Sequence, residues 1–560
     1  MSADRKPING LSHVRGATDA PLREETIPAL LATVAADPQA EAAVFPAQGI
    51  RWTYAEFARE VDRLAGGLHR LRVGKGDRVG IWSPNRYEWL LTQFATARIG
   101  AILVCVNPAY RVYELEYALN KSGCKALITA PAFKTSNYVE MIQSLAPEMA
   151  AGGDWRASRL PDLAHVIVMG DDIPAGALGF DAVCANGDSV GADELNAISS
   201  GLSNNDPINI QFTSGTTGSP KGACLTHRNI VNNAHFVTST MNFTAEDRLC
   251  IPVPFYHCFG MVMGTLGCVT KGATMVVPGE GFDPAETLRA AADERCTALY
   301  GVPTMFVAEL ALADFDSYDL SQLRTGIMAG APCPIEVMKE VQNRMNMGEV
   351  TIAYGMTETS PVSFQSNVDD PIEKRVSTVG RIHPHVECKV VDEAGAMLPA
   401  GHKGELMTRG YSVMREYWAD AEKTADALDG DGWMRTGDLA VIDEDGYCDI
   451  AGRVKDMIIR GGENIYPREV EDFLFTHPDI AQAQVFGVSD AKYGEIVCAW
   501  VIPAPDASIS EEDVRAFCKA RIAHFKVPTH VRIVPELPMT VTGKPQKFLM
   551  REAMEKELAA

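Results

Sequence analysis

The chain has 560 residues, too many for one ordinary hydrophobic core, so we expect about two to four domains. Hydrophobic residues make up 46% of it and charged residues 22%, which excludes a disordered or fibrous protein. The 51 basic and 73 acidic side chains give a formal net charge of −22, which excludes a general binder of nucleic acid. No apolar run approaches the roughly 18 residues of a transmembrane helix, and residues 1–10 are polar, so we expect a cytoplasmic protein without an integral membrane segment.

Short runs rich in β-branched residues alternate with helical patterns through the middle of the chain. This alternation predicts an α/β fold with a mainly parallel sheet, in which ligands bind at the carboxyl ends of the strands. The loops after Phe212 and Ala353 are therefore the first candidates for a site. The polar stretch 188–207 is predicted to be an exposed loop. The predicted strands are 164–169, 208–212, 274–277, 297–300 and 350–353, and the predicted helices are 284–296 and 334–347.

The sequence pattern changes after about residue 455. From there the chain predicts a small α+β domain that ends in a helix. We therefore place a boundary between an N-terminal domain, 1–454, and a C-terminal domain, 455–560. The 13 cysteines include no Cys-x-x-Cys pair, so we expect them to be reduced. The predicted elements of this domain are strands 483–488, 496–502 and 530–534 and helices 467–476 and 510–524.

A loop dense in glycine and hydroxyl groups follows the predicted strand 208–212. Glycines let backbone N–H groups approach an anion closely, and hydroxyls and a lysine add further donors, so the loop is suited to a polyphosphate. A P-loop NTPase motif would end in Gly-Lys followed by Ser or Thr, whereas the lysine here is preceded by Pro220 and followed by Gly222. The candidate phosphate-binding residues are Thr213, Ser214, Gly215, Thr216, Thr217, Gly218, Ser219, Pro220 and Lys221.

Four further motifs follow this loop in order. They are 354–358 (YGMTE), 436–438 (TGD), 452–456 (GRVKD) and 538–544 (PMTVTGK). With the loop, this ordered set resembles the adenylate-forming superfamily, which contains acyl-CoA synthetases, luciferases and the adenylation domains of peptide synthetases. The resemblance extends from about Thr53 to the last helix. Within the superfamily, segments 107–119, 211–234, 454–473 and 517–528 are most similar to medium-chain fatty acyl-CoA ligases.

The resemblance implies a fold and an activity. The fold would be a large N-terminal adenylate-forming domain with mainly parallel sheets and a small mobile C-terminal domain. The activity would be that of an ATP-dependent ligase, which uses Mg²⁺, activates a carboxylic acid as an acyl-adenylate with release of pyrophosphate, and transfers the acyl group to coenzyme A. Dimers are common among similar enzymes, so a homodimer is a candidate state.

The resemblance also implies roles around the phosphates. The loop 213–221 would close over the β- and γ-phosphates, and Thr357 would contact the α-phosphate. Glu358 would hold Mg²⁺, a hard cation that prefers carboxylate oxygen. Lys544 would bridge the substrate carboxylate and the α-phosphate while charge builds between two anions.

Other residues would hold the adenosine. Tyr354 resembles the aromatic residue that stacks on adenine. Asp438 resembles the carboxylate that accepts hydrogen bonds from both ribose hydroxyls, with Arg453 supporting the ribose and phosphate. The opposite wall of the adenine slot would consist of Gly330, Ala331 and Pro332.

The second half-reaction requires a different arrangement, because Lys544 has to leave before the CoA thiol reaches the acyl carbonyl. The resemblance implies that the small domain rotates about one hinge residue, at the position of Lys455. The rotation would present a glycine-containing segment that leaves room for pantetheine. The residues of this segment are Arg460, Gly461, Gly462 and Glu463.

The acyl pocket is the part of the site for which the sequence offers the fewest candidate residues. His257 resembles the residue at the mouth of that pocket. Gly260, Gly264 and Gly267 follow at helical spacing, and either close helix packing or an acyl tunnel would explain them.

Three other functions fit parts of this pattern. A stand-alone adenylating enzyme could load a carrier protein in place of CoA. A luciferase-type enzyme would oxidise the same adenylate, but no feature favours it. A non-catalytic nucleotide-binding protein is disfavoured because Lys544, Glu358 and Asp438 are all present.

Overall fold

The computed structural model describes residues 5–213, 220–331, 333–460, 463–490, 492–505, 507–519, 521–540 and 544–559. The chain forms two compact units, each built from separate segments. The first consists mainly of Arg15–Glu387 and Arg409–Met434, and the second of Ser2–Val14, Cys388–Thr408 and Arg435–Ala560. Lys455 therefore lies inside the second unit, so the predicted boundary at 454/455 does not separate these two units and a hinge there stays a prediction.

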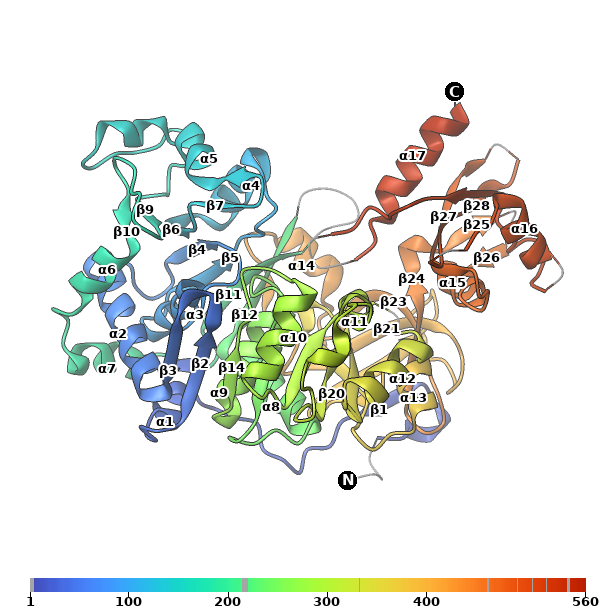
Figure 1. Cartoon of the computed structure of the whole chain (residues 1–560), viewed down its shortest axis with the longest axis horizontal. Coiled ribbons are helices and arrows are strands. Elements are labelled where there is room, and N and C mark those ends of the chain that lie inside the picture. The colour runs from blue at the N-terminus through green and yellow to red at the C-terminus, as the bar shows by residue number, and fades with distance from the viewer. Residues whose placement is uncertain are drawn as a thin grey trace. The chain divides into compact units, whose positions relative to one another are not determined.

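A mainly parallel sheet fills one part of the first unit (Figure 1). Its central strand β5 (Ile102–Cys105) is a continuous apolar run that is buried on both faces, as expected of a parallel strand covered by helices. Two antiparallel strands, β12 and β22, complete one edge. In spatial order the strands within the described residues are β10 (Leu178–Gly179), β9 (His165–Val168), β6 (Cys124–Thr129), β4 (Arg78–Trp82), β5 (Ile102–Cys105), β11 (Pro207–Thr213), β12 (Lys221–Thr226) and β22 (Glu416–Tyr417).

A second large sheet in the same unit is also mainly parallel. Its parallel core runs from β17 to β2, and antiparallel strands cover both ends. In spatial order the described strands are β19 (Arg381–Ile382), β18 (Val362–Gln365), β17 (Glu349–Gly355), β16 (Thr325–Ala329), β15 (Ala298–Gly301), β13 (Arg248–Cys250), β14 (Thr274–Val276), β2 (Glu41–Phe45) and β3 (Ile50–Thr53). A small hairpin pairs β7 (Ala132–Phe133) with β8 (Ser136–Asn137).

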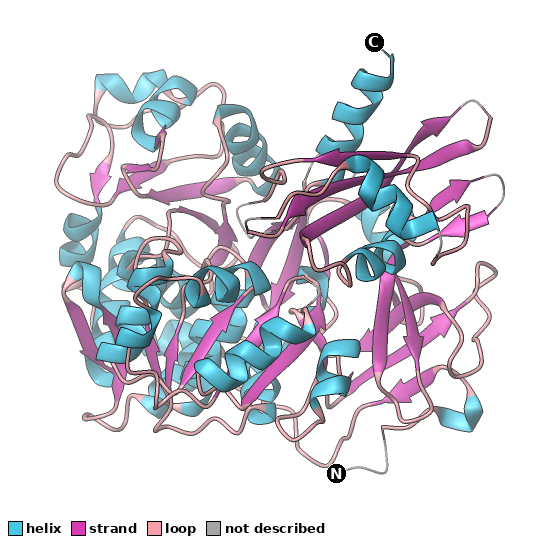
Figure 2. Cartoon of the chain, turned by 45° about the vertical axis from the view of Figure 1, so that its right-hand side comes forward, coloured by secondary structure: helices cyan, strands magenta, loops and turns pink. Residues whose placement is uncertain are grey.

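Helices pack against both sheets, and local sequence signals set their ends (Figure 2). At the start of α2, the Thr53 hydroxyl accepts the Glu56 N–H while the Glu56 carboxylate accepts the Thr53 N–H. Thr226 and Asn229 form the same reciprocal cap at the start of α8. The helices are α1 (Ile27–Val34), α2 (Tyr54–Arg70), α3 (Tyr87–Arg98), α4 (Val112–Ser122), α5 (Tyr138–Leu145), α6 (Phe180–Gly187), α7 (Ala192–Ser200), α8 (His227–Thr240), α9 (Gly267–Lys271), α10 (Pro284–Asp293), α11 (Pro303–Leu310), α12 (Ile335–Arg344), α13 (Ile372–Ser377) and α14 (Ala421–Ala427).

The second unit contains two smaller sheets. One lies almost entirely in this unit and orders its strands as β1 (His13–Arg15), β20 (Val386–Val391), β21 (Gly404–Gly410), β23 (Met434–Ile442) and β24 (Cys448–Arg453). The other has its own apolar core against three helices. Its elements are β25 (Ile458–Arg460), β26 (Glu463–Ile465), β27 (Ile480–Asp490), β28 (Gly494–Pro503), β29 (His530–Ile533), α15 (Pro467–Leu474), α16 (Glu511–Lys519) and α17 (Lys547–Ala559).

The structure confirms the predicted strands and helices and the mainly parallel sheets, with ends that differ by a few residues. The predicted loop 188–207 is wrong in its centre, where α7 lies. Asp193 and Glu194 occupy the first turn of α7, where carboxylates interact favourably with the helix dipole, and Leu195 is buried. All 13 cysteines are buried and reduced, in agreement with the prediction. In the described part of the chain, no helix is long and apolar enough to cross a membrane.

Candidate active site

The predicted phosphate loop connects two paired antiparallel strands in the first unit. At the last rung of the β11–β12 ladder, Thr213 lies opposite Lys221. The Thr213 hydroxyl donates to the Lys221 carbonyl at 3.4 Å, and the Pro220 carbonyl accepts from the Tyr117 hydroxyl at 3.0 Å. Both ends of the loop are thus held by the sheet and by α4. Ser214, Gly215, Thr216, Thr217, Gly218 and Ser219 lie outside the described residues.

Glu358 and Thr357 lie at the carboxyl end of β17, in the short 3-10 helix η6 (Thr357–Thr359). Both side chains are buried, and Glu358 is only 4% exposed. The Glu358 Oε1 atom lies 3.4 Å from the Thr213 hydroxyl, so it shares the single proton of that hydroxyl with the Lys221 carbonyl. The structure therefore brings together the end of β11 and the segment after β17, and these two strands belong to different sheets.

Tyr417, on the edge strand β22, is part of the same cluster and was not among the predicted site residues. Its hydroxyl donates to Glu358 Oε1 at 2.8 Å and accepts from Lys221 Nζ at 3.0 Å. The Lys221 ammonium also lies 4.2 Å from the centre of the Tyr417 ring. Burial, together with the Glu358 carboxylate, raises the pKa of the Tyr417 hydroxyl well above its usual range, so the hydroxyl keeps its proton.

The Glu358 carboxylate is suited to Mg²⁺. The described residues contain no group of three or more His, Cys, Asp or Glu side chains that could hold a metal ion. Mg²⁺ needs no such group, because it is usually bound through one or two carboxylates plus substrate phosphates and water. Among the described residues, only Thr213 and Tyr417 donate to the Glu358 carboxylate, and both donate to Oε1. Oε2 is therefore the oxygen that fits a metal ligand.

The predicted adenine slot lies at the carboxyl ends of two neighbouring parallel strands. Ala329 of β16 is in register with Ala353 of β17, so the residues that follow them are neighbours. Gly330 follows β16 with φ +90°, a backbone conformation that favours glycine. Tyr354 follows Ala353 and is half-buried, with its ring centre 6.4 Å from that of Phe364. Gly330 and Tyr354 thus each follow a member of the Ala329–Ala353 pair, Ala331 comes after Gly330, and Pro332 lies outside the described residues.

Asp438 and Arg453 form a pair in the second unit. They lie opposite each other on β23 and β24, and Arg453 Nε lies 3.2 Å from an Asp438 carboxylate oxygen. Asp438 is 5% exposed, and its N–H donates to the Thr436 hydroxyl at 3.1 Å. The strands thus hold a buried carboxylate beside a guanidinium that is half exposed.

The predicted acyl-pocket residues lie in or just before a buried segment with π-helical hydrogen bonds, η4 (Phe259–Leu266). His257 precedes it and accepts the Phe259 N–H at Nδ1. A Cβ atom added to Gly260 would lie 2.4 Å from the Pro254 carbonyl oxygen, and one added to Gly264 would lie 3.2 Å from the Ile251 side chain. Close packing is therefore sufficient to explain both glycines, and their contact with an acyl chain stays a prediction.

The predicted catalytic and hinge lysines are both exposed and both lie in the second unit. Two hydrogen bonds join Thr540 and Lys544: the Lys544 N–H donates to the Thr540 hydroxyl at 2.9 Å, and the Lys544 carbonyl accepts the Thr540 N–H at 2.7 Å. Lys455 lies in the 3-10 helix η7 (Val454–Asp456), directly after β24.

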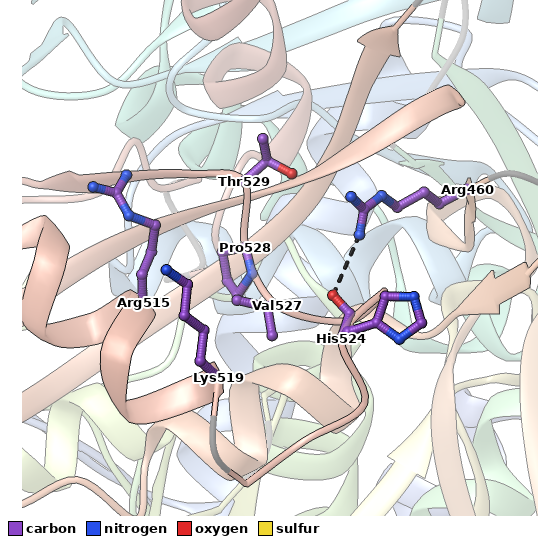
Figure 3. Close-up of a pocket in the computed structure, with 7 residues that line it drawn as sticks. All are labelled: Arg460, Arg515, Lys519, His524, Val527, Pro528 and Thr529. Atoms are coloured by element: carbon purple, nitrogen blue, oxygen red, sulfur yellow. Dashed lines mark hydrogen bonds between the residues drawn. The ribbon is translucent and has the colours of Figure 1, made fainter. Parts of the chain in front are cut away.

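A basic pocket of about 330 Å³ lies beside Arg460 in the second unit (Figure 3). Arg515 and Lys519 lie one turn apart on α16, on the side of the pocket opposite Arg460, and neither forms an ion pair with a described residue. Arg460 donates to the Phe525 carbonyl at 2.8 Å, while its Nε is buried without a partner in the described part of the chain. Glu463 is exposed on β26, and Gly461 and Gly462 lie outside the described residues. The pocket is lined by Arg460, Arg515, Lys519, His524, Val527, Pro528 and Thr529.

Comparison with known proteins gives matches along almost the whole chain. Residues 30–418 match the family described as AMP-binding enzyme, and residues 469–544 match the AMP-binding enzyme C-terminal domain. The chain is 48% identical to the mitochondrial medium-chain acyl-CoA ligase ACSF2 of Danio rerio, over 99% of this chain and 92% of the relative. It is also 48% identical to the Bacillus subtilis protein YngI, over 95% of this chain and 98% of the relative. Among solved structures, the anthranilate CoA ligase AuaEII in complex with anthranoyl-AMP matches with a TM-score of 0.82 and 26% identity, over 97% of this chain and 99% of that one.

Proposed function

Because the chain belongs to the AMP-binding enzyme family, we propose that it is an AMP-forming acyl-CoA synthetase acting on fatty acids of medium chain length. It activates the carboxylate as an acyl-adenylate, releases pyrophosphate and transfers the acyl group to coenzyme A. The observation that carries the proposal is the cluster of half-buried Thr213 and Lys221 with buried Glu358 and Tyr417, which joins the ends of the proposed phosphate loop to a carboxylate. A lone buried carboxylate beside a phosphate-binding loop fits a reaction at a metal-bound nucleotide.

The first half-reaction brings two anions together, so it depends on positioning and on neutralised charge. In the proposed roles, Lys221 and the rest of the loop 213–221 bind the β- and γ-phosphates, and Thr357 binds the α-phosphate. Mg²⁺, held by Glu358, would neutralise charge on the phosphate oxygens. Lys544 bridges the substrate carboxylate and the α-phosphate.

Other proposed roles concern the adenosine. Tyr354 offers its ring face to adenine, against a wall of Gly330, Ala331 and Pro332. Asp438 accepts hydrogen bonds from the two ribose hydroxyls, and Arg453 supports the ribose and phosphate. The support for Asp438 is that it is a buried carboxylate beside the half-exposed guanidinium of Arg453.

Coenzyme A is the proposed acceptor, and the basic pocket supports it. Arg515 and Lys519 are like charges one helical turn apart, which repel each other until an anion binds between them. A CoA phosphate is such an anion, and it would bind next to Arg460, the first residue of the segment proposed to contact CoA. Rotation at Lys455 exchanges Lys544 for this segment between the two half-reactions.

The proposed acyl chain length, oligomeric state and cellular location are supported by the sequence and by relatives. A relative named as a medium-chain acyl-CoA ligase supports a medium-chain substrate. His257 is the residue proposed to lie at the mouth of the acyl pocket. The homodimer and the cytoplasmic location stay predictions, and the mitochondrial relative makes the mitochondrial matrix the alternative location. Light scattering and cell fractionation test these two predictions.

The decisive experiment measures pyrophosphate release with ATP, Mg²⁺ and carboxylic acids from acetate to palmitate, with and without CoA. We expect release with acid alone, a sharp increase with CoA, and a maximum at medium chain length. Pyrophosphate release without acylation of CoA would point instead to a carrier protein as acceptor. No pyrophosphate with any acid would refute the proposed function.

A further inference from the structure

We propose that Tyr417 is a positioning residue for MgATP binding: its hydroxyl fixes the Glu358 carboxylate so that Oε2 faces the metal. This inference rests on the proposed function, since it takes Glu358 as the metal ligand. It concerns a residue that lies nearly sixty positions after Glu358 in the sequence and in none of the motifs 213–222, 354–358, 436–438, 452–456 or 538–544.

The backbone of Tyr417 is fixed before any ligand binds. β22 pairs with β12, where Tyr417 lies opposite Ala223, and the next N–H, of Trp418, donates to the Gly222 carbonyl at 2.7 Å. The Tyr417 N–H donates to the Thr424 hydroxyl at 3.0 Å. The strand that carries Lys221 therefore also holds Tyr417, so the two side chains have one common support.

The direction of the hydroxyl proton is fixed as well. The Lys221 ammonium has only donors, so at 3.0 Å it occupies a lone pair of the Tyr417 oxygen. The single hydroxyl proton is then directed to Glu358 Oε1, 2.8 Å away. A buried tyrosine that is 4% exposed has little freedom to choose another partner.

This arrangement leaves the two carboxylate oxygens of Glu358 in different environments. Oε1 accepts from Tyr417 and from the more distant Thr213, whereas Oε2 accepts from no described residue. A carboxylate held by one oxygen presents the other in a fixed direction. Outer hydrogen bonds of this kind orient metal ligands, and their loss typically weakens metal binding about 10- to 100-fold.

The test is Tyr417→Phe, which removes the hydroxyl and keeps the ring beneath Lys221. Isothermal titration with ATP in the absence of acid and CoA reads binding alone, so the choice of acyl substrate does not matter. We expect the dissociation constant to rise about 10-fold or more in Mg²⁺. In EDTA, where ATP binds without metal, we expect a change of less than about threefold.

Tyr411→Phe is the matched control, because Tyr411 is also a buried tyrosine of the segment 409–434. Among the described residues, its hydroxyl accepts only a 3.4 Å hydrogen bond from Asn233. We expect this variant to bind MgATP like the wild type. A double-mutant cycle adds Glu358→Gln: in that background Tyr417→Phe should change binding by less than about twofold, because the hydroxyl acts through the carboxylate.

Three results would overturn the inference. They are wild-type MgATP binding by Tyr417→Phe, an equal loss in Mg²⁺ and in EDTA, or an undiminished loss in the Glu358→Gln background. Equal loss together with a lowered melting temperature would indicate a structural role only. Failure of the wild type itself to bind MgATP would refute the proposed function and this inference together, whereas binding without pyrophosphate release would refute the proposed function alone.

Discussion

His227 makes the first unit sensitive to acid, and the size of the effect follows from its surroundings. The side chain is 0% exposed at the start of α8, where the helix dipole disfavours a positive charge. Its Nδ1 accepts the Ile27 N–H at 3.2 Å, which only a neutral imidazole can do. Burial is the main cause that lowers the pKa of His227 from 6.5 to about 4.

The sign of the pH dependence follows from this lowered pKa. The unfolded chain binds the proton more tightly than the folded chain does, so the stabilisation is complete above about pH 6.5 and is lost as the pH falls toward 4. At about 1.36 kcal/mol per pKa unit, the full loss is about 3 kcal/mol. Between pH 7 and pH 5, we expect a loss of about 2 kcal/mol in the free energy of unfolding.

The assay compares the wild type with His227→Gln, whose amide oxygen can still accept the Ile27 N–H but does not titrate. Urea unfolding at pH 7 and pH 5, followed by tryptophan fluorescence, should show the variant losing about 2 kcal/mol less than the wild type. The exposed His402→Gln is the control and should behave like the wild type. Equal losses in the wild type and in His227→Gln would refute the reasoning.

The remaining predictions concern the two half-reactions. Lys544→Ala should lower pyrophosphate release by about 100-fold or more, while thioester formation from supplied acyl-adenylate changes little; an equal loss in both assays would contradict its role. Lys455→Pro should leave adenylation within about threefold and abolish CoA acylation, because proline fixes the backbone at the hinge; normal CoA turnover would exclude this hinge. Replacing both Arg515 and Lys519 with alanine should raise the KM for CoA by about 10-fold and leave the KM for ATP unchanged. An unchanged KM for CoA would show that the basic pocket is not a CoA subsite.

Local patterns in the sequence predicted strands and helices that the structure confirms. The runs 208–212 and 350–353 are strands in the structure, as their β-branched residues predict, although Asn209, Gln211 and Thr351 within them are polar. α7 was missed because most of its side chains are polar and exposed, and its single buried Leu195 gives no periodic signal.

The site residues that belong to sequence motifs were predictable. A residue that joins the site only through the pairing of two distant strands was not. Glu358 belongs to the motif 354–358, and the structure places it near Thr213. Tyr417 joins the cluster only because β22 pairs with β12, and no local pattern encodes a contact between residues so far apart in the chain. A tyrosine next to Trp418 in a polar stretch was the sole sequence signal.

The order of strands in the second unit has a consequence for how the chain folds during synthesis. β1 (His13–Arg15) pairs with β20, which begins at Val386. The ribosome therefore synthesises β1 long before its partner strand. At about 5–20 residues per second, the ribosome needs on the order of 20 to 70 s to deliver β20. During that time the apolar Val14 has no native partner strand, and a chaperone or ribosome surface that shields it would protect the nascent chain.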